Sequence, residues 1–234
     1  MNLEHKIIKI RDLSFKDSES MLALMQKYFK NVTRERFYMD LKEKDLCILL
    51  THNNEVKGFS TQVFSSLIIE KKEKLILFSG DTVIDSEYRN SFNLFISWGK
   101  LVLSTIEKQP DKNFYWILTT KGFRTYRLLS VLFSEYYPAP KINVPNKERI
   151  IIEKYCKNKF GNKFISDKLI ISADNTGQIL RQKDAEITES RKKNINISFF
   201  EKVNPGYIKG DELVCIVPLY KKNILPFMLK KCLK

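Results

Sequence analysis

The sequence predicts a mixed α/β fold in which helices cover a mixed β-sheet. Three observations carry this prediction. An apolar, β-branched segment ends in a polar corner and continues as a helix within Lys74–Leu103. Three strand-like runs, the last of which is this apolar segment, follow one another before the corner and are separated by short polar turns. A second buried strand leads directly into a second helix within residues 113–133.

The first elements are expected to be one strand and two helices. Ile7–Ser14 (IIKIRDLS) has the apolar pattern of a strand, and Lys16–Lys30 carries apolar residues at helical spacing. A further helix is expected over Thr33–Lys42, where Thr33 can act as the N-cap.

The next elements form a meander of strands. Asn53-Asn54 and Lys71-Lys72-Glu73 supply the polar turns between them. The expected strands are Asp45–Thr51, Val56–Ile69 and Leu75–Ile84.

The last of these strands ends in the corner Asp85-Ser86-Glu87-Tyr88-Arg89-Asn90-Ser91. A helix should follow, because apolar residues recur at helical spacing at Phe92, Phe95, Trp98 and Val102. A helix that begins at such a corner presents free backbone N–H groups and the positive end of its dipole. The corner is therefore a candidate phosphate receptor.

The remaining chain divides at the proline-rich segment 136–140. Before it, Asn113–Thr120 is expected to be a buried strand and Lys121–Phe133 a helix. We therefore expect a core over residues 1–138 and a C-terminal extension over residues 139–234, integrated with the core and completing or covering its sheet. The extension should contain a helix at Asn146–Phe160 and strands at Lys168–Ser172, Ile195–Val203 and Glu212–Pro218.

Composition limits the functional classes. With 234 residues, 43% of them hydrophobic, the chain can bury a full core. No apolar run approaches the about 18–20 residues of a membrane span, and the N-terminus lacks a secretory signal, so a cytoplasmic protein is expected. The four cysteines are scattered and only His5 and His52 are present, so no metal site is expected.

The formal net charge of +14 favours a negatively charged partner. Nucleic acid is one such partner, but the sequence contains no helix-turn-helix, zinc-finger, RRM or KH signature. An acidic protein or a phosphate-bearing ligand would use the same positive field.

The segment Lys74–Leu103 resembles the acyl-CoA-binding segment of the GNAT (Gcn5-related N-acetyltransferase) family. There, a strand ends in a turn reading Arg/Gln-x-x-Gly-x-Gly/Ala, and the next helix receives the pyrophosphate of coenzyme A. Arg89 matches the first position, whereas Phe92 and Leu94 occupy the two small ones. The expected order of elements over residues 6–138 is also that of the family core, and Gly58 matches a glycine of its third strand.

The resemblance implies an N-acyltransferase that moves an acyl group from a phosphopantetheine thioester to an amine, without a covalent enzyme intermediate. The donor would be acyl-CoA or an acidic acyl carrier protein, whose arm lacks the distal nucleotide that Phe92 and Leu94 would crowd. The donor-binding residues that the resemblance implies are Val83, Ile84, Asp85, Arg89, Asn90, Ser91, Phe92, Asn93 and Leu94.

The resemblance also implies the catalytic roles. The N–H of Val83, Ile84 or Asp85 would polarise the thioester carbonyl. Asp81, where a β-bulge could turn its side chain towards the acceptor, would serve as the base; the alternative is a carboxylate that pairs with a lysine or caps a turn. Tyr126 would protonate the leaving sulfur; the alternative is an aromatic side chain packed in the core.

The acceptor is expected to be an amine of a peptide or small molecule, as in natural-product biosynthesis. The aromatic setting of the donor corner, with 16 Phe and 10 Tyr in the chain, favours an acyl group longer than acetyl. Two other classes stay open: a non-catalytic GNAT-like protein that binds an acyl donor or a partner, and a basic nucleic-acid adaptor.

Overall fold

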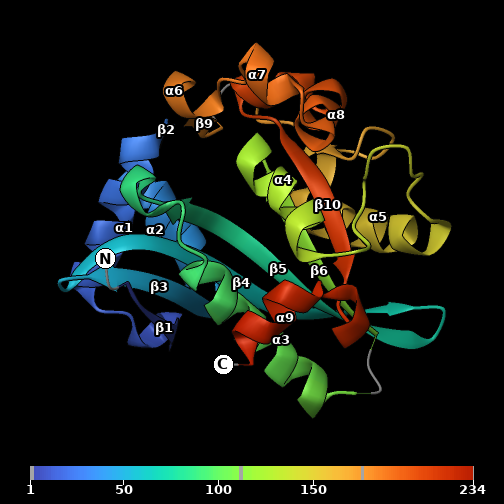
Figure 1. Ribbon diagram of the computed structural model, residues 1–234, viewed down its shortest axis with the longest axis horizontal. Helices are drawn as coiled ribbons and strands as arrows, with labels where there is room; N and C mark the ends of the chain where they lie inside the picture. The colour runs from blue at the N-terminus through green and yellow to red at the C-terminus, as the bar shows by residue number, and fades with distance from the viewer. Residues whose placement is uncertain (1–2, 111–112, 175–176, 234) are drawn as a thin grey trace.

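An eight-stranded mixed sheet organises the chain in this computed structural model, which describes residues 3–110, 113–174 and 177–233. The strand order is β1-β3-β4-β5-β6-β10-β8-β7, and β5 and β6 form its one parallel pair among the described residues (Figure 1). The strands are β1 Glu4–Lys9, β3 Leu46–His52, β4 Glu55–Ile69, β5 Lys72–Ile84, β6 Asn113–Thr120, β7 Phe164–Ile165, β8 Ile170–Ile171 and β10 Glu212–Pro218.

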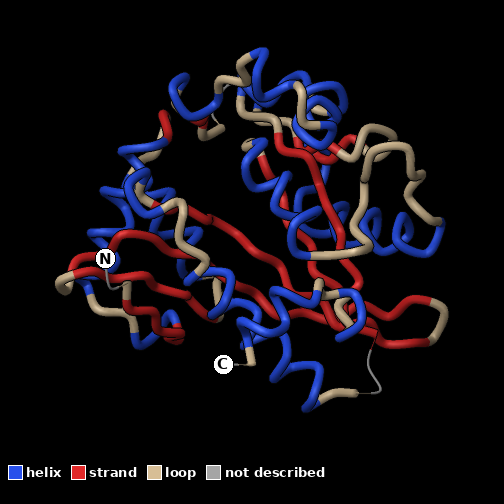
Figure 2. Tube along the Cα trace, in the orientation of Figure 1, coloured by secondary structure: helices blue, strands red, loops and turns tan. Residues whose placement is uncertain are grey.

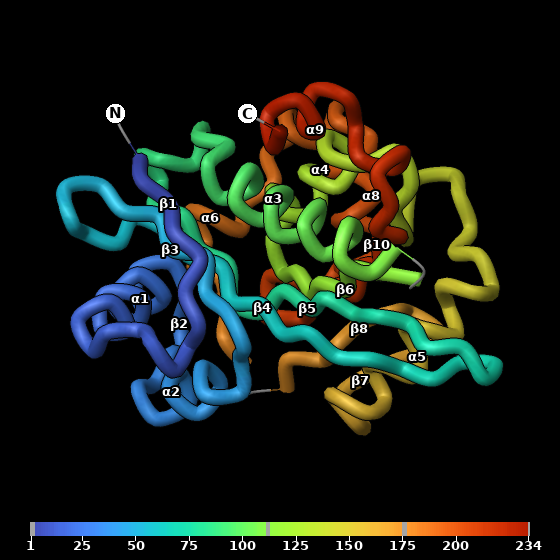
Figure 3. The backbone as a smooth tube through the Cα atoms, turned by 90° about the horizontal axis from the view of Figure 1, so that it is seen from below, coloured from blue at the N-terminus to red at the C-terminus, as the bar shows by residue number. Residues whose placement is uncertain are grey.

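Helices cover both faces of the sheet (Figure 3). One face packs against α3 Asn93–Lys108, α4 Phe123–Leu132, α8 Ile195–Val203 and α9 Pro226–Cys232. The other face packs against α1 Phe15–Tyr28, α2 Arg34–Lys42 and α5 Asn146–Phe160. Strand alternation in β5 creates both interfaces, because Leu75 and Leu77 join the first core and Ile76 and Phe78 the second.

The C-terminal part of the chain completes the sheet, as predicted. Strand β10 pairs antiparallel with β6 from Leu213↔Thr120 to Pro218↔Tyr115, and β8 pairs with its other edge. A second, two-stranded sheet joins β2 Phe29–Lys30 to β9 Ile179–Leu180 and links the extension to the end of α1. Two short helices, α6 Gln182–Ala185 and α7 Glu189–Lys192, follow β9.

Two predicted strands are corrected by the structure. Ile195–Val203 is helix α8, not a strand: the Asn194 side chain caps the N–H groups of Asn196 and Ile197, and Ile197 and Phe200 are buried at helical spacing. The predicted strand Ile7–Ser14 is also wrong in its extent. Strand β1 ends at Lys9, a 3₁₀ turn spans Ile10–Asp12, and Ser14 caps α1 by accepting a hydrogen bond from the Asp17 N–H.

Helix α9 had no counterpart in the prediction. It packs on α3 at Gly99, where an added Cβ would lie 2.3 Å from Cys232 Sγ. Glycine at this position therefore permits the close approach of the two helices. None of the helices in the described part of the chain has the length and apolar character of a membrane span.

The sheet forks between β5 and β6, where Figure 2 shows the two strands separating. Their parallel pairing ends at Ser79↔Leu118, although β5 continues to Ile84 and β6 to Thr120. Beyond this point β5 stays paired with β4 and β6 with β10, so the sheet continues as two wings. A β-bulge falls in β5 at the fork, because Ser60 pairs with Thr82 but Gln62 pairs with Ser79.

A buried hydrogen-bond network holds the fork together. Gln62, which is 0% exposed, accepts from Ser79 Oγ at 2.7 Å and donates to Ser60 Oγ at 2.8 Å. Trp116 Nε1 donates to Ser79 Oγ, and the hydroxyls of Ser60 and Thr82 lie 2.7 Å apart. The network spans β4, β5 and β6 and so fixes the point at which the strands separate.

Candidate active site

A cavity of about 1000 Å³ fills the space beyond the fork and reaches both faces of the sheet. We call its two ends the α3 side and the α2 side. The α3 side is lined by Phe92, Leu94, Phe95, Trp98, Phe123 and Leu128. The α2 side is lined by Arg36, Asp40, Lys44, Lys159, Phe160 and Lys163.

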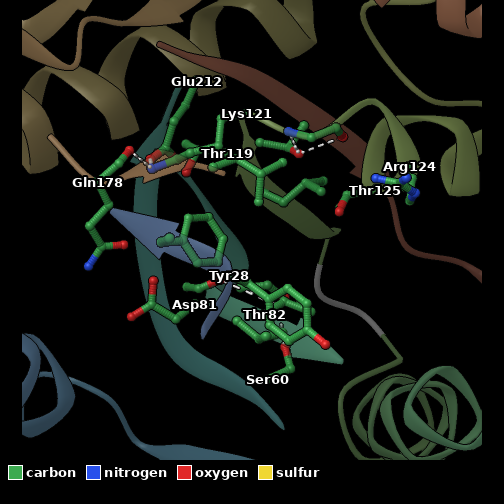
Figure 4. Close-up of a pocket in the computed structure, with 18 of the residues that line it drawn as sticks. Tyr28, Ser60, Asp81, Thr82, Thr119, Lys121, Arg124, Thr125, Gln178 and Glu212 are labelled. Carbon is green, nitrogen blue, oxygen red and sulfur yellow. Dashed lines mark hydrogen bonds and ion pairs between the residues drawn. The ribbon is translucent and has the colours of Figure 1, made fainter. Parts of the chain in front are cut away.

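Asp81 lines this cavity at the bulge of β5. Within the described part of the chain, its carboxylate makes no hydrogen bond or ion pair, and Figure 4 shows it directed away from the strand. Burial raises the pKa of Asp81 from 3.8 to about 6, and the nearby Asp40 carboxylate acts in the same direction. The group is thus ionised at neutral pH and basic enough to accept a proton.

Lys121 and Glu212 face Asp81 across the cavity (Figure 4). Lys121 Nζ lies 2.7 Å from Glu212 Oε1 and donates to the Gln178 carbonyl at 3.1 Å. Burial alone would raise the pKa of Glu212, but the charge and hydrogen bond of Lys121 outweigh it and hold the pKa below its usual value. The two carboxylates thus have pKa values shifted in opposite directions, with Asp81 suited to proton transfer and Glu212 to a permanent charge.

Of the three backbone N–H groups considered as donors to the oxyanion, strand geometry leaves one without a partner strand. The Asp85 N–H is used, because it donates to the Lys57 carbonyl of β4 at 2.8 Å. Successive N–H groups of a strand point in opposite directions, so the Val83 N–H also faces β4, where Val83 pairs with Phe59. The Ile84 N–H therefore faces the open edge left by β6.

The corner after β5 leaves backbone N–H groups available at the start of α3. Among the described residues, the N–H groups of Leu94 and Phe95 have no hydrogen-bond acceptor, and both residues line the cavity. Phe92 and Leu94, at the two motif positions where the family has small residues, pack against neighbouring side chains. Phe92 meets Phe227 of α9 edge-on with ring centroids 6.3 Å apart, and Leu94 is buried with Tyr88. The start of α3 thus presents N–H groups that can receive an anion, without the glycines.

Arg89 is partly buried and has three partners within the protein. Its Nε donates to the Ile84 carbonyl at 3.1 Å, its guanidinium lies 4.5 Å from the centre of the Tyr28 ring, and its Nη1 lies 2.5 Å from Asp184 Oδ1. Asp184 belongs to α6 of the extension, and its carbonyl accepts from Arg124. The Asp184 carboxylate thus occupies the position in which a phosphate of the acyl donor would contact Arg89.

Three other residues that were predicted to bind the acyl donor, Asp85, Ser91 and Asn93, have structural roles. Asp85 binds Lys27 Nζ at 2.6 Å and the Tyr28 hydroxyl at 3.1 Å; burial would raise its pKa, but these bonds outweigh it and the pKa is lowered. Ser91 Oγ accepts from the Asn93 N–H, and Asn93 Nδ2 donates to the Leu3 carbonyl. Asn90 and Ser91 line the cavity.

Tyr126 lies outside the cavity, which corrects its predicted role as the general acid. Its side chain is 0% exposed, its hydroxyl donates to the Pro138 carbonyl at 2.8 Å, and its ring packs on Phe200. Burial raises the pKa of this hydroxyl further from the physiological range. The neighbouring Thr125 and Arg127 line the cavity, whereas Tyr126 points from the opposite face of α4 into the core.

Sequence reasoning missed Lys44, Lys121, Glu212 and Asp184. Each comes from a different segment, and their proximity depends on how α2, β10 and α6 pack around the fork. Glu212 at the start of a predicted strand was the one available signal, because a charged residue there can face a cleft. Across the described ranges 3–110, 113–174 and 177–233, no group of three or more His, Cys, Asp or Glu side chains could hold a metal ion.

The order of helices and strands over β1 to α4 matches the expected core. The observed succession β1, α1, α2, β3, β4, β5, α3, β6, α4 is the one predicted from the family resemblance, apart from the two-residue β2. The predicted fold class is confirmed.

No protein-family model and no curated protein matches the sequence. An acetyltransferase from Trypanosoma brucei is similar in structure, with 15% identity over 61% of this chain and 100% of that chain and a TM-score of 0.40. A GNAT family N-acetyltransferase from Escherichia coli in complex with CoA has 15% identity over 56% of this chain and 70% of that chain, with a TM-score of 0.40. A chain of the NatC complex bound to Gag peptide and CoA has 12% identity over 94% of this chain and 100% of that chain, with a TM-score of 0.42.

Proposed function

We propose that this protein transfers an acyl group from a phosphopantetheine thioester to an amine. The observation that carries the proposal is the forked sheet, whose cavity reaches both faces and places Asp81 and the Ile84 N–H on one strand wall. A thioester arm and an amine can then approach from opposite sides and meet between β5 and β6. Such positioning removes much of the entropic barrier of a two-substrate reaction.

The chemistry follows from the two groups on β5. The amine must lose a proton to become a nucleophile, and Asp81, with its pKa near 6, accepts that proton directly or through water. Attack on the thioester carbonyl creates a negative oxygen, which the Ile84 N–H stabilises. Collapse of this intermediate forms the amide and breaks the C–S bond, and the departing thiolate takes up a proton from water or the one that Asp81 had accepted.

The donor occupies the α3 side in this proposal. The free N–H groups of Leu94 and Phe95 receive its phosphate, and the aromatic lining at Phe95, Trp98 and Phe123 accommodates an acyl group longer than acetyl. The negative charge of Asp184 beside Arg89 would repel any phosphate beyond the first one. This favours the arm of an acidic acyl carrier protein, which has a single phosphate, over coenzyme A, which has more. The net charge of +14 supports the same partner.

Release of free thiol tests the reaction. The purified protein is incubated with matched acyl-CoA and acyl carrier protein donors of several chain lengths, with and without amines, and the thiol and the N-acyl product are measured. Amine-dependent thiol release is expected, with more turnover from the carrier protein. No release with any donor would reject the enzyme, and a clear preference for coenzyme A would reject the carrier protein.

A protein that binds the donor without turnover is the second candidate. The Arg89–Asp184 pair favours it, because the basic anchor of the predicted phosphate site already has a negatively charged partner. Native mass spectrometry separates the two candidates. A bound acyl donor that stays intact in the presence of amines would establish the binding protein.

A further inference from the structure

Two lysines on the α2 side of the cavity have more N–H donors than internal acceptors among the described residues. Lys44 is buried, with a side chain 2% exposed, and its Nζ lies 2.6 Å from Asp40 Oδ1. Within the described part of the chain, Asp40 is the one group to which this ammonium donates, and an ammonium has three N–H donors. Two of its donors therefore remain for a ligand in the cavity.

Lys159 is a second cation on the same side. It extends from the last turn of α5, and its Nζ lies 5.0 Å from the centre of the Phe78 ring and 5.9 Å from that of Phe160. Among the described residues, it makes no hydrogen bond or ion pair. Lys159 is an exposed residue whose ammonium group borders the cavity. Partial desolvation and the charge of Lys44 lower the pKa of Lys159, and Glu43 and Asp40 oppose this shift.

Two other lysines that line the cavity already have carboxylate partners. Lys163 has its own partner, with its Nζ 2.7 Å from Asp174 Oδ2, and Lys121 has Glu212. Asp40, on Lys44, is the one carboxylate in contact with either ammonium group among the described residues, while Glu43 and Asp81 act on the pair through their charge without contacting it. The unused N–H donors of the two ammonium groups lie beside the aromatic rings of Phe78 and Phe160 and can bind an anion.

The location of this site identifies the ligand. An added Cβ at Gly80 would lie 2.9 Å from Lys44 Cε, so Lys44 packs directly against the backbone that precedes Asp81. In the proposed reaction the acceptor amine lies at Asp81. An anion at Lys44 and Lys159 is therefore a short distance from the reacting nitrogen, as the carboxylate of an amino acid is from its own amine.

We infer that the acceptor is an amine bearing a carboxylate, with Lys159 and Lys44 as the carboxylate-binding residues on the α2 side of the cavity. This inference rests on the proposed function for the place of the amine. The carboxylate can be the α-carboxylate of a free amino acid or an acidic side chain at the start of a peptide. Lys159 acts in acceptor specificity and does not touch the reacting atoms.

Matched acceptors test the inference. Acyl transfer is measured with amino acids and with their carboxamides, which keep the amine and lose the charge, and rates are compared per unprotonated amine. The wild-type protein should prefer amino acids by about 10-fold or more in kcat/KM. Two peptides that differ only in an acidic or neutral first residue form a further pair, and a preference confined to this pair identifies a side-chain carboxylate.

Lys159→Met should remove the preference by raising KM for the carboxylate-bearing acceptor about 10-fold, with kcat/KM for the carboxamide unchanged. Lys157→Met is the matched control, since Lys157 lies on the same helix but pairs with Glu153 outside the cavity. Equal use of both acceptors in every pair by the wild-type protein would overturn the inference.

Calorimetry without an acyl donor separates this inference from the proposed function. The amino acid should bind the wild-type protein and the Lys157→Met variant more tightly than its carboxamide does, and Lys159→Met should lose the difference. If that pattern holds while no amine is acylated, the carboxylate site stands and the acyltransferase proposal fails. Equal binding within the amino-acid pair and within the peptide pair would overturn the carboxylate site even where acyl transfer occurs.

Discussion

The cations that line the two sides of the cavity differ in their carboxylate partners. On the α3 side Arg89 is paired with Asp184, and both side chains are largely buried, at 26% and 13% exposed. On the α2 side Lys44 has Asp40 while Lys159 has no carboxylate partner among the described residues. A ligand on the α3 side must compete with an internal carboxylate, whereas a ligand on the α2 side meets ammonium donors that have no internal acceptor among the described residues.

The two sides also differ in which atoms they offer. The α3 side presents backbone N–H groups at Leu94 and Phe95, whose availability depends on the turn and not on side-chain identity. The α2 side presents ammonium and carboxylate groups from α2 and α5. Substitutions should therefore change acceptor use on the α2 side more readily than donor use on the α3 side.

Asp81→Asn should have the largest effect on activity, because it removes the base between the two sides. We expect kcat/KM to fall by about 10²–10³-fold. The wild-type rate should rise with pH up to about 6 as Asp81 ionises, and the residual rate of the variant should lack this rise. A variant that keeps wild-type turnover would remove Asp81 from the mechanism.

The same variant should be more stable at neutral pH. The folded-state pKa of Asp81 is raised from 3.8 to about 6, so the folded protein holds the proton more tightly and loses stability as pH rises through this window. Asn carries no charge and avoids this loss. Allowing for partial exposure, the free energy of unfolding should increase by about 1–2 kcal/mol at pH 7 and stay unchanged near pH 3, as measured by urea denaturation.

Tyr126→Phe should separate stability from chemistry. The Pro138 carbonyl loses its buried hydrogen-bond donor, so we expect a loss of about 1–2 kcal/mol in the free energy of unfolding. Turnover should stay within about twofold, because the hydroxyl lies outside the cavity. A fall of 100-fold in kcat with an unchanged KM would instead restore Tyr126 as a proton donor.

Local patterns in the sequence predicted the fold well where one segment decides its own structure. The strand at Asn113–Thr120, the helix at Asn146–Phe160 and the strand at Glu212–Pro218 have the predicted bounds. The prediction of a strand at Ile195–Val203 was wrong. Its β-branched residues favour strands, but the Asn194 cap and the packing of Phe200 on Tyr126 stabilise a helix.

The site was predictable only where it lies on β5. Asp81 beside a bulge is local information, since a glycine in a strand often marks one. The pairings Arg89–Asp184 and Lys121–Glu212 join residues separated by 95 and 91 positions, and nothing in either segment specifies its partner. Tyr126 illustrates the same limit, because one helical position separates the cavity from the core.

Asp184→Asn should have the smallest effect and tests how the α3 side is neutralised. Asn keeps the hydrogen-bond acceptor for Arg89 but loses the charge that competes with a phosphate. Because a partly exposed ion pair contributes up to about 1 kcal/mol, coenzyme A should bind about two- to fivefold more tightly, while pantetheine, which has no phosphate, should bind unchanged. Weaker binding of coenzyme A alone would show that Asp184 orients Arg89 for the donor, and the contrast between the two sides would then be one of arrangement and not of competition.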